Sequence, residues 1–248
     1  MLTLRNIGKI FPGGVVALAG LDMQLHAGEF VSLLGPSGCG KSTVLRIITG
    51  LTEPTSGSVE WLDGAYGARQ FGFVFQEPTL MPWASVARNV VLPLKLQGRL
   101  EDAEKRVANV LARVGLSEFA ENYPRELSGG MKMRASIARA LVTEPDLLLM
   151  DEPFAALDEI TRFRLNNDLL ALWQSMQRTV VFVTHSVFES VYLSQRVIVM
   201  TPRPGRVFTE VPIDAPYPRN ERFRTSAAYA AHCRRVSESL AQAMGEQS

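Results

Sequence analysis

The chain has 248 residues, of which 46% are hydrophobic and 21% are charged, and its formal net charge is +1. This composition is typical of a soluble globular protein, and the length fits one large α/β domain or two small ones. The near-neutral charge argues against a nucleic-acid partner, which requires a basic surface. No run approaches the roughly 18 apolar residues of a membrane-spanning helix, and residues 1–11 have no signal-peptide core. We therefore expect a cytosolic chain that reaches a membrane only through a partner.

Short apolar runs alternate with helical patterns along most of the chain. Apolar residues recur at helical spacing over 107–114, and Ser128 precedes a further helix that ends before Pro145. Strands that alternate with helices predict a mostly parallel sheet. The proline-rich stretch 202–218 is expected to cross the surface, and 245–248 to be frayed. The expected strands cover 2–16, 29–34, 58–62, 71–75, 147–150, 179–183 and 196–200, and the expected helices cover 41–49, much of 85–142 and 226–244.

Residues 35–42 read Gly-Pro-Ser-Gly-Cys-Gly-Lys-Ser and fit the phosphate-loop pattern G-x-x-x-x-G-K-[ST], between an expected strand and an expected helix. Glycines let the backbone curl around an anion, so that N–H groups and the positive end of the helix point at it. Lys41 adds a mobile charge for the β- and γ-phosphates of ATP, Ser42 offers a hydroxyl to Mg²⁺, and Thr43 reaches another phosphate. Cys39 is interpreted as a spacer. The residues expected to bind nucleotide here are Gly35, Pro36, Ser37, Gly38, Cys39, Gly40, Lys41, Ser42 and Thr43.

The apolar strand expected over 147–150 ends in two carboxylates, Asp151 and Glu152. The end of a parallel strand lies at the edge of the sheet where phosphate-loop proteins bind Mg²⁺ and nucleotide. Asp151 suits the coordination sphere of Mg²⁺, directly or through water, and Glu152 suits polarising the water that attacks the γ-phosphate. The alternative is a pair of solvated acids at a strand end, which the phosphate loop in the same chain disfavours.

A third motif, Leu-Ser-Gly-Gly-Met at 127–131, stands at the expected start of a helix. A phosphate loop, an LSGG run and an LLLMDEP strand, in this order, closely resemble the ABC (ATP-binding cassette) ATPases from about residue 2 to 219. The resemblance implies an α/β fold, with a phosphate-loop ATPase core of mostly parallel sheet, an antiparallel β subdomain and a helical insert. The expected ATPase domain is 1–219, with its core in 1–84 and 143–219 and its helical subdomain over about 85–142. The helical tail, 220–248, is interpreted as a packing element rather than a regulatory appendage.

The resemblance assigns roles to further residues. Phe11 matches the aromatic residue that stacks on adenine, with core packing on an edge strand as the alternative. Gln76 matches the glutamine that senses Mg²⁺ and the γ-phosphate, His185 matches the switch histidine, and Asp158 matches the loop that crosses between subunits. The expected catalytic residues are Glu152, His185, Lys41 and Gln76, and the expected Mg²⁺ ligands are Ser42, Gln76 and Asp151.

The signature motif implies a second copy of the chain. In the family, the positions of Ser128, Gly129 and Gly130 bind the γ-phosphate that the phosphate loop of the other subunit holds. The resemblance therefore implies an ATP-dependent homodimer with two ATPs between head-to-tail chains. Met131 stands where glutamine is commoner, so a polar contact is lost there. Because the serine and both glycines are intact, we expect activity to persist.

Residues 75–83, Asn89-Val90 and 200–206 resemble one importer subgroup in particular, which handles nitrate, alkanesulfonates and taurine. The resemblance implies a transport-coupled ATPase (a translocase) that uses ATP and Mg²⁺ and lies peripherally at the cytoplasmic face of the inner membrane. Its partners would be two transmembrane permease subunits and, indirectly, a solute-binding protein. Trp83 would line the groove for a short permease helix, with a plain core aromatic as the alternative. Sulfonate-, taurine- or nitrate-type anions are the expected cargo, and pyrimidine precursors and other small organic ligands are the competing choices.

Two other classes of function are weighed against the importer. A soluble ABC ATPase that acts on ribosomes or DNA is disfavoured by the single cassette, the ordinary insert and the near-neutral charge. An ATP-gated interaction module that binds without turnover would require the loss of Glu152 or His185, and both are present.

Overall fold

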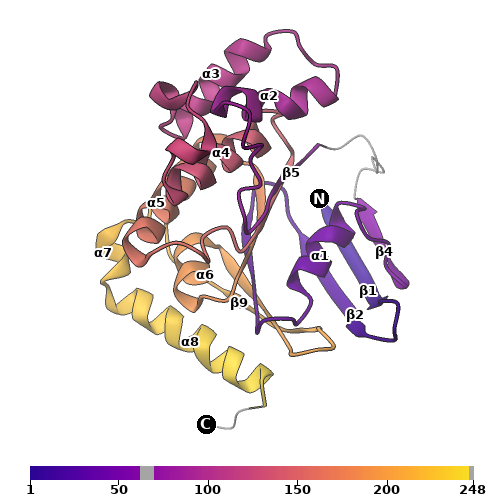
Figure 1. Cartoon of the computed structure of the whole chain (residues 1–248). Helices are drawn as coiled ribbons and strands as arrows, with labels where there is room; N and C mark the ends of the chain where they lie inside the picture. The colour runs from indigo at the N-terminus through magenta and orange to yellow at the C-terminus, as the bar shows by residue number, and fades with distance from the viewer. Residues whose placement is uncertain (62–69, 246–248) are drawn as a thin grey trace. The chain divides into compact units, whose positions relative to one another are not determined.

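The computed structural model describes residues 1–61 and 70–245 (Figure 1). By their contacts the residues form two compact units, the first made of Met1–Arg69 with Thr179–Ser248 and the second of Gln70–Arg178. The predicted helical subdomain over 85–142 falls within the second unit, and its boundaries stay a prediction. None of the helices in the described ranges has the length and apolar character that crossing a bilayer requires.

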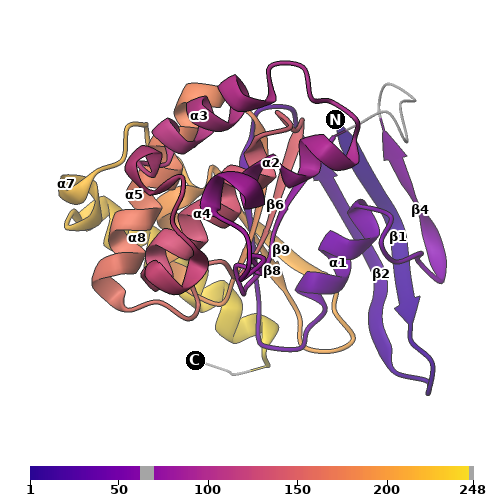
Figure 2. The same ribbon diagram turned by 45° about the horizontal axis from the view of Figure 1, so that its top comes forward.

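An antiparallel sheet of three strands, in the order β2-β1-β4, belongs to the first unit (Figure 2). Leu2, Leu4 and Ile7 of β1 are fully buried, because one face of the sheet is covered. The predicted antiparallel β subdomain is thus confirmed, although the second strand extends well beyond the predicted range 2–16. Residue 62, the predicted end of the third strand, lies outside the described residues. The bounds are Leu2–Ile10 for β1, Val16–Leu25 for β2 and Ser56–Trp61 for β4.

The core of the first unit is a run of four strands in the order β7-β3-β8-β9. Strands β7, β3 and β8 are parallel, and β9 is antiparallel to β8. Every residue of β3 and β7 is buried, as expected for central strands covered on both faces. The predicted strands over 29–34, 179–183 and 196–200 are confirmed. The bounds are Phe30–Leu34 for β3, Thr179–Thr184 for β7, Arg196–Met200 for β8 and Val207–Pro212 for β9.

Strand β9 lies within the proline-rich stretch 202–218, for which the sequence predicts a course across the surface and no strand. An edge strand tolerates proline, because the side of the strand that faces solvent needs no backbone N–H for the ladder. Pro212 is the last residue of β9, opposite Arg196 of β8. Only Val211 of β9 is buried, so the predicted course across the surface agrees with the structure, while the strand itself had no counterpart in the prediction.

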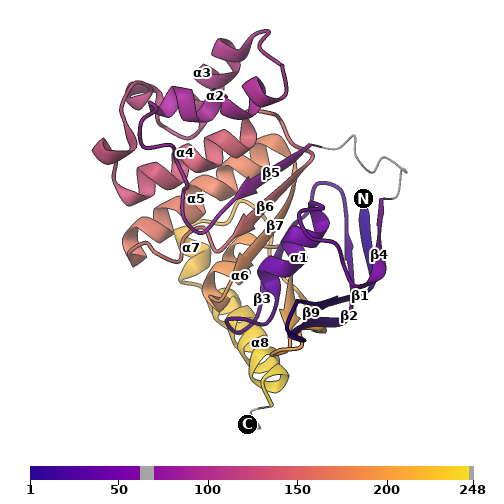
Figure 3. The ribbon, with the colours of Figure 1, turned by 45° about the vertical axis from the view of Figure 1, so that its right-hand side comes forward.

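Four helices lie in the described residues of the first unit. Helix α1 follows β3 through the phosphate loop (Figure 3), which confirms the helix predicted over 41–49. Helix α8 confirms the helix predicted over 226–244, and the predicted fraying beyond Gly245 lies outside the described residues. The bounds are Lys41–Ile48 for α1, Val187–Leu193 for α6, Glu221–Arg224 for α7 and Ala227–Ala243 for α8.

A buried arginine anchors the C-terminal tail. Arg219 is only 4% exposed, and its guanidinium lies 4.2 Å from the centre of the Tyr217 ring. Burial raises the pKa of Tyr217 to about 12, so its hydroxyl stays a donor, and it donates to the carbonyl of Leu193. Beyond the anchor, the face of α8 that packs inward carries Tyr229, Cys233 and Val236. The carbonyl oxygens that accept from Arg219 are those of Val191, Tyr192, Ser194, Ile213 and Ala215.

The second unit combines a parallel pair of strands, β5 and β6, with helices. The strands predicted over 71–75 and 147–150 and the helical stretch over 85–142 are confirmed. Helix α5, which follows the second strand, had no counterpart in the prediction. The bounds are Phe71–Val74 for β5, Leu147–Asp151 for β6, Val86–Leu96 for α2, Ala103–Arg113 for α3, Gly129–Leu141 for α4 and Glu159–Met176 for α5, with short 3₁₀ turns at Ser117–Phe119 and Pro124–Glu126.

Candidate nucleotide-binding and catalytic site

The phosphate loop curls from the end of β3 into the first turn of α1. Gly40, at the N-cap of α1, has φ of 105°, a conformation that costs little only for glycine. Lys41 is 4% exposed, and its Nζ donates to the carbonyl oxygens of Gly35 at 2.8 Å and Pro36 at 3.1 Å. The loop thus closes around its own lysine, which concentrates a positive charge beside the backbone N–H groups of the helix start.

Three parallel strands of the first unit end side by side at this loop. Leu34 of β3 is in register with Thr184 of β7 and with Val199 of β8. The phosphate loop therefore leaves the same edge of the sheet as His185, which follows β7, and as the loop that follows β8. Ligands of open α/β sheets bind at such a carboxyl edge. The structure thus places the predicted switch histidine and the predicted phosphate loop at one edge of one sheet.

The turn that carries His185 is fixed by its neighbours. The hydroxyl of Thr184 donates to Oε2 of Glu189 at 2.5 Å and accepts from the backbone N–H of Ser186 at 3.0 Å. Ser186 in turn caps α6 by accepting from the N–H of Glu189. His185 itself is exposed. The imidazole is therefore presented to solvent on a turn whose backbone is held from both sides.

Phe11 lies in the hairpin turn between β1 and β2 rather than in a strand. It is half-buried, the Nζ of Lys9 lies 5.3 Å from the centre of its ring, and its N–H donates to the carbonyl of Val15. The structure does not place Phe11 in the core, which was the alternative to adenine stacking. The chain that leaves this turn reaches the phosphate loop, because a Cβ on Gly40 would lie 3.1 Å from the carbonyl oxygen of Ala17.

In the second unit, the predicted glutamine and carboxylates follow neighbouring strands. Val74 of β5 is in register with Met150 of β6, so Gln76 and Glu152 each lie two residues beyond the same level of the ladder. Asp151 is the last residue of β6. Glu152 has φ of 46°, a left-handed conformation that costs a non-glycine residue of order 1 kcal/mol and that clusters at functional sites. The structure thus brings these three predicted residues to one edge and holds one of them under backbone strain.

The signature motif forms the N-terminus of α4. Ser128 is the N-cap residue, and its Oγ accepts from the backbone N–H of Met131 at 3.3 Å. Ser128 and Gly129 are exposed. A Cβ on Gly130 would lie 2.9 Å from Cγ2 of Thr161 on α5, so only glycine lets the two helices approach this closely. The exposed start of a helix with its positive dipole end is the kind of surface that binds anions.

Asp158 caps α5, next to the signature motif. Its Oδ1 accepts from the N–H of Thr161 at 2.9 Å, and the hydrogen bonds from the side chain and backbone of Thr161 lower the pKa of the Asp158 carboxyl. A Cβ on Gly129 would lie 3.2 Å from the side chain of Leu157. The loop predicted to cross between subunits and the signature motif are therefore neighbours within the second unit.

Two polar residues that the sequence analysis did not assign to the site hold the segment after Gln76. Arg139 of α4 donates to the carbonyls of Pro78 and Thr79, both at 2.8 Å. Asn89 of α2 is fully buried. Its side-chain oxygen accepts a hydrogen bond from the segment after Gln76, and its side-chain NH₂ donates to backbone carbonyls there. The partners of Asn89 are the N–H of Met81 and the carbonyls of Met81, Ala84 and Ser85.

Trp83 sits on the segment that these residues hold. Its side chain is 75% exposed, so the alternative of a core aromatic was wrong. A rigidly supported, exposed tryptophan is a feature of protein interfaces.

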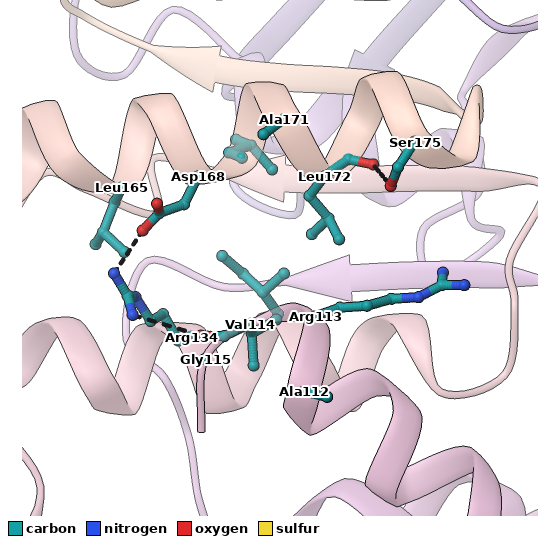
Figure 4. Close-up of a pocket in the computed structure, with 12 residues that line it drawn as sticks. Ala112, Arg113, Val114, Gly115, Arg134, Leu165, Asp168, Ala171, Leu172 and Ser175 are labelled. Carbon is teal, nitrogen blue, oxygen red and sulfur yellow. Dashed lines mark hydrogen bonds and ion pairs between the residues drawn. The ribbon is translucent and has the colours of Figure 1, made fainter. Parts of the chain in front are cut away.

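A cavity of about 380 Å³ opens between the end of α3 and the facing sides of α4 and α5 (Figure 4). Arg134 and Asp168 point toward each other at its wall and form an ion pair of 2.5 Å, while Leu165 and Leu172 supply apolar lining. None of the predicted site residues is among those that line it. The cavity therefore belongs to the packing of the helices rather than to the predicted nucleotide site.

The residues present fit ATP with Mg²⁺. The first unit offers glycines in left-handed conformation, a buried lysine and the hydroxyl of Ser42, while the second offers the oxygens of Asp151 and Gln76. Among the described residues, no cluster of three or more His, Cys, Asp or Glu side chains could hold a metal ion on its own. Mg²⁺ in nucleotide sites is bound by one or two protein oxygens together with phosphates and water, and each unit carries oxygens of this kind.

Comparison with known proteins identifies the family. The ABC transporter family model matches residues 18–155. The chain is 45% identical over 225 residues to an aliphatic sulfonates import ATP-binding protein of Pseudomonas syringae pv. syringae, covering 90% of each chain. It is 44% identical over 235 residues to a nitrate import ATP-binding protein of Synechocystis sp., covering 90% of this chain and 88% of the relative. A solved dimeric ATP-binding cassette in a post-hydrolysis state with ADP and Pi superposes with a TM-score of 0.75 at 34% identity, covering 87% of this chain and 100% of that one.

The chain therefore belongs to the ABC transporter family, whose ATP-binding cassettes hydrolyse ATP to drive transport. Within the family it is an ATP-binding subunit of the group that contains the sulfonate and nitrate import proteins. The predicted family and fold class are confirmed, while the roles predicted for single residues stay predictions.

Proposed function

We propose that the chain is the ATPase of an importer for a small solute, bound to the cytoplasmic face of the inner membrane by two permease subunits. The observation that carries the proposal is the edge where β7, β3 and β8 end, with the closed phosphate loop, the buried Lys41 and the exposed His185 in one unit. The relatives whose names record sulfonate and nitrate import support the direction of transport.

The first unit supplies charge and a hydrogen-bonding side chain. On nucleotide binding, Lys41 exchanges the carbonyls of Gly35 and Pro36 for phosphate oxygens, because an ammonium gains more from an anion than from a neutral carbonyl. Ser42 offers its hydroxyl to Mg²⁺, which neutralises charge on the phosphates when it is bound. Thr43 holds a phosphate, and His185 orients the γ-phosphate and the attacking water. Phe11 offers a ring face to the base.

The second unit supplies the groups that act on water and on the partner's nucleotide. Glu152 polarises the attacking water, and the strained backbone at this position fixes its direction. Asp151 and Gln76 are the oxygen ligands expected for Mg²⁺. Because phosphoryl transfer depends mainly on positioning and charge neutralisation, the fixed turns around these residues are suited to the reaction.

A second copy of the chain completes each site. Ser128, Gly129 and Gly130 form a helix N-terminus, exposed at Ser128 and Gly129, that neutralises the γ-phosphate held by the other copy. The neighbouring Asp158 loop lies at the same contact. The solved dimeric cassette supports this arrangement. Loss of the γ-phosphate removes these contacts and lets the dimer open.

Trp83 is proposed to dock the permease. We expect Trp83→Ala to weaken binding to detergent-solubilised permease subunits by about thirtyfold, since an anchoring tryptophan in an interface is typically worth about 2 kcal/mol. Hydrolysis by the isolated chain should stay within about twofold of wild type, because the side chain serves an interface rather than the chemistry. Leu51→Ala, at a 66% exposed leucine of the first unit, is the matched control. Equal binding by Trp83→Ala and wild type would contradict the docking role.

The cargo is proposed to be a sulfonate-, taurine- or nitrate-type anion, with a pyrimidine precursor as the alternative. The test uses the chain reconstituted with its permease subunits and binding protein, and measures phosphate release against taurine, alkanesulfonates, nitrate and pyrimidine precursors. Stimulation by one compound names the cargo. Basal hydrolysis without stimulation by any of them would contradict the cargo proposal, and absence of basal hydrolysis would contradict the site assignment.

A further inference from the structure

The loop that joins β8 to β9, residues 201–206, closes on itself. The N–H of Thr201 donates to the carbonyl of Arg206 at 3.0 Å, and the N–H of Arg206 donates to Oγ1 of Thr201 at 3.0 Å. The hydroxyl of Thr201 also donates to the carbonyl of Pro204 at 3.2 Å. These hydrogen bonds give the β8–β9 loop an ordered conformation.

The β8–β9 loop lies directly against the phosphate loop. Nε and Nη2 of Arg203 both donate to the carbonyl oxygen of Gly38, each at 3.2 Å. Two residues after Arg203, Gly205 packs so closely on the phosphate loop that a Cβ there would overlap the carbonyl oxygen of Cys39. The backbone of Gly205 is itself fixed, since its N–H donates to Ala17 and its carbonyl accepts from Ala19 of β2. The β8–β9 loop thus contacts the phosphate loop at two residues, Gly38 and Cys39.

Arg203 fixes the direction of a peptide group in the phosphate loop. The carbonyl of Gly38 and the N–H of Cys39 belong to one planar peptide group, so holding one orients the other. That N–H closes the loop on the carbonyl of Pro36 at 3.3 Å. Gly38 has φ of 75°, where glycine has the freedom to turn its carbonyl either way. A carbonyl oxygen turned toward the anion site would repel phosphate. The hydrogen bonds from the Arg203 guanidinium hold the Gly38 carbonyl oxygen in its present direction.

We propose that Arg203 is a positioning residue for nucleotide binding, which holds the Gly38 carbonyl away from the phosphates and keeps the phosphate loop in its binding conformation. The β8–β9 loop is then an outer support of the nucleotide site. The proposal rests on the proposed function of the phosphate loop, and it predicts an effect that depends on the β- and γ-phosphates of the ligand.

The experiment measures equilibrium binding of ADP, ATP and AMP, each with Mg²⁺, to the full-length chain and its variants. We expect Arg203→Gln to weaken ADP and ATP binding about tenfold, the effect of losing one hydrogen bond from a charged donor. AMP binding should weaken less than about twofold, since AMP lacks the β- and γ-phosphates, which the loop holds with Lys41. Arg203→Lys should recover part of the affinity, because an ammonium can still donate to one carbonyl.

Arg206→Gln is the matched control. Arg206 is exposed on the same loop, and no hydrogen bond or ion pair of its side chain occurs among the described residues, so its replacement makes the same charge change without loss of the contact. Its ADP affinity should match wild type, and both variants should unfold within about 2 °C of wild type, as surface substitutions do.

The outcomes separate the inference from the function on which it rests. If wild type fails to bind ADP, the proposed function is wrong. If wild type binds and Arg203→Gln binds equally well, or loses AMP and ADP affinity to the same extent, the positioning role is wrong. Gly205→Ala offers a second route, because its Cβ would push on Cys39 from the same side, and it should also weaken ADP more than AMP. A folded Gly205→Ala variant with unchanged ADP affinity would contradict the support by this loop.

Discussion

Replacing Glu152 by glutamine is expected to lower the rate of ATP hydrolysis by about two to four orders of magnitude while ATP binding persists, because a positioned base typically contributes that much. Glutamine keeps the shape of the side chain but loses the negative charge that polarises water. Phosphate release at saturating Mg²⁺-ATP measures the rate, and binding of a fluorescent ATP analogue measures the affinity. Because the γ-phosphate is no longer lost, the variant should accumulate as an ATP-bound dimer in size-exclusion chromatography.

The control for this change is Glu118→Gln, at an exposed glutamate of the first 3₁₀ turn, which should hydrolyse ATP at the normal rate. Wild-type hydrolysis without the membrane partner should rise more steeply than linearly with protein concentration, since each site needs two copies. Turnover of Glu152→Gln at the wild-type rate would show that another group serves as the base. A strictly linear concentration dependence at micromolar protein would contradict the shared site.

The parts of the site that could be predicted from sequence are those built from local backbone. The phosphate loop is recognisable because eight consecutive residues meet the needs of an anion. The structure adds the left-handed glycine at 40 and the burial of Lys41, but neither changes the interpretation. The N-cap role of Ser128 follows from the same local logic, since serine before a helical pattern is a preferred cap.

The supports of the site could not be predicted, because they depend on residues far apart in sequence. Arg203 meets Gly38 across 165 positions, and Arg139 meets Thr79 across 60. An arginine on a helix or in a proline-rich loop has the pattern of a solvated side chain. Only the pairing of β8 beside β3 brings the first of these arginines to the phosphate loop. Strand β9 had no counterpart for another reason: its partner β8 is only a short loop away, but prolines within a stretch weaken its pattern as a strand.

Replacing Arg219 by methionine is expected to reduce the free energy of unfolding by about 3 kcal/mol or more, because buried acceptors would be left without a donor. Burial lowers the pKa of the Arg219 guanidinium, which reflects the cost of placing a charge here. The carbonyls that surround it and the rings of Tyr217 and Phe223, at 4.2 and 5.4 Å, offset that cost. Methionine fills similar space and keeps the apolar contacts, so the loss reports the hydrogen bonds together with the cation–π contacts.

Urea unfolding of the nucleotide-free chain measures this change, and Arg222→Met, at an exposed arginine of α7, should unfold at the wild-type midpoint. Lysine at 219 should recover only a small part of the loss, because one ammonium cannot reproduce a planar fork that donates to carbonyls on several sides. Since Val191, Tyr192 and Ser194 belong to or follow the helix after His185, loss of the anchor should also loosen that helix and slow hydrolysis. An unchanged urea midpoint for Arg219→Met would show that these carbonyls find other donors and that the tail is held by α8 alone.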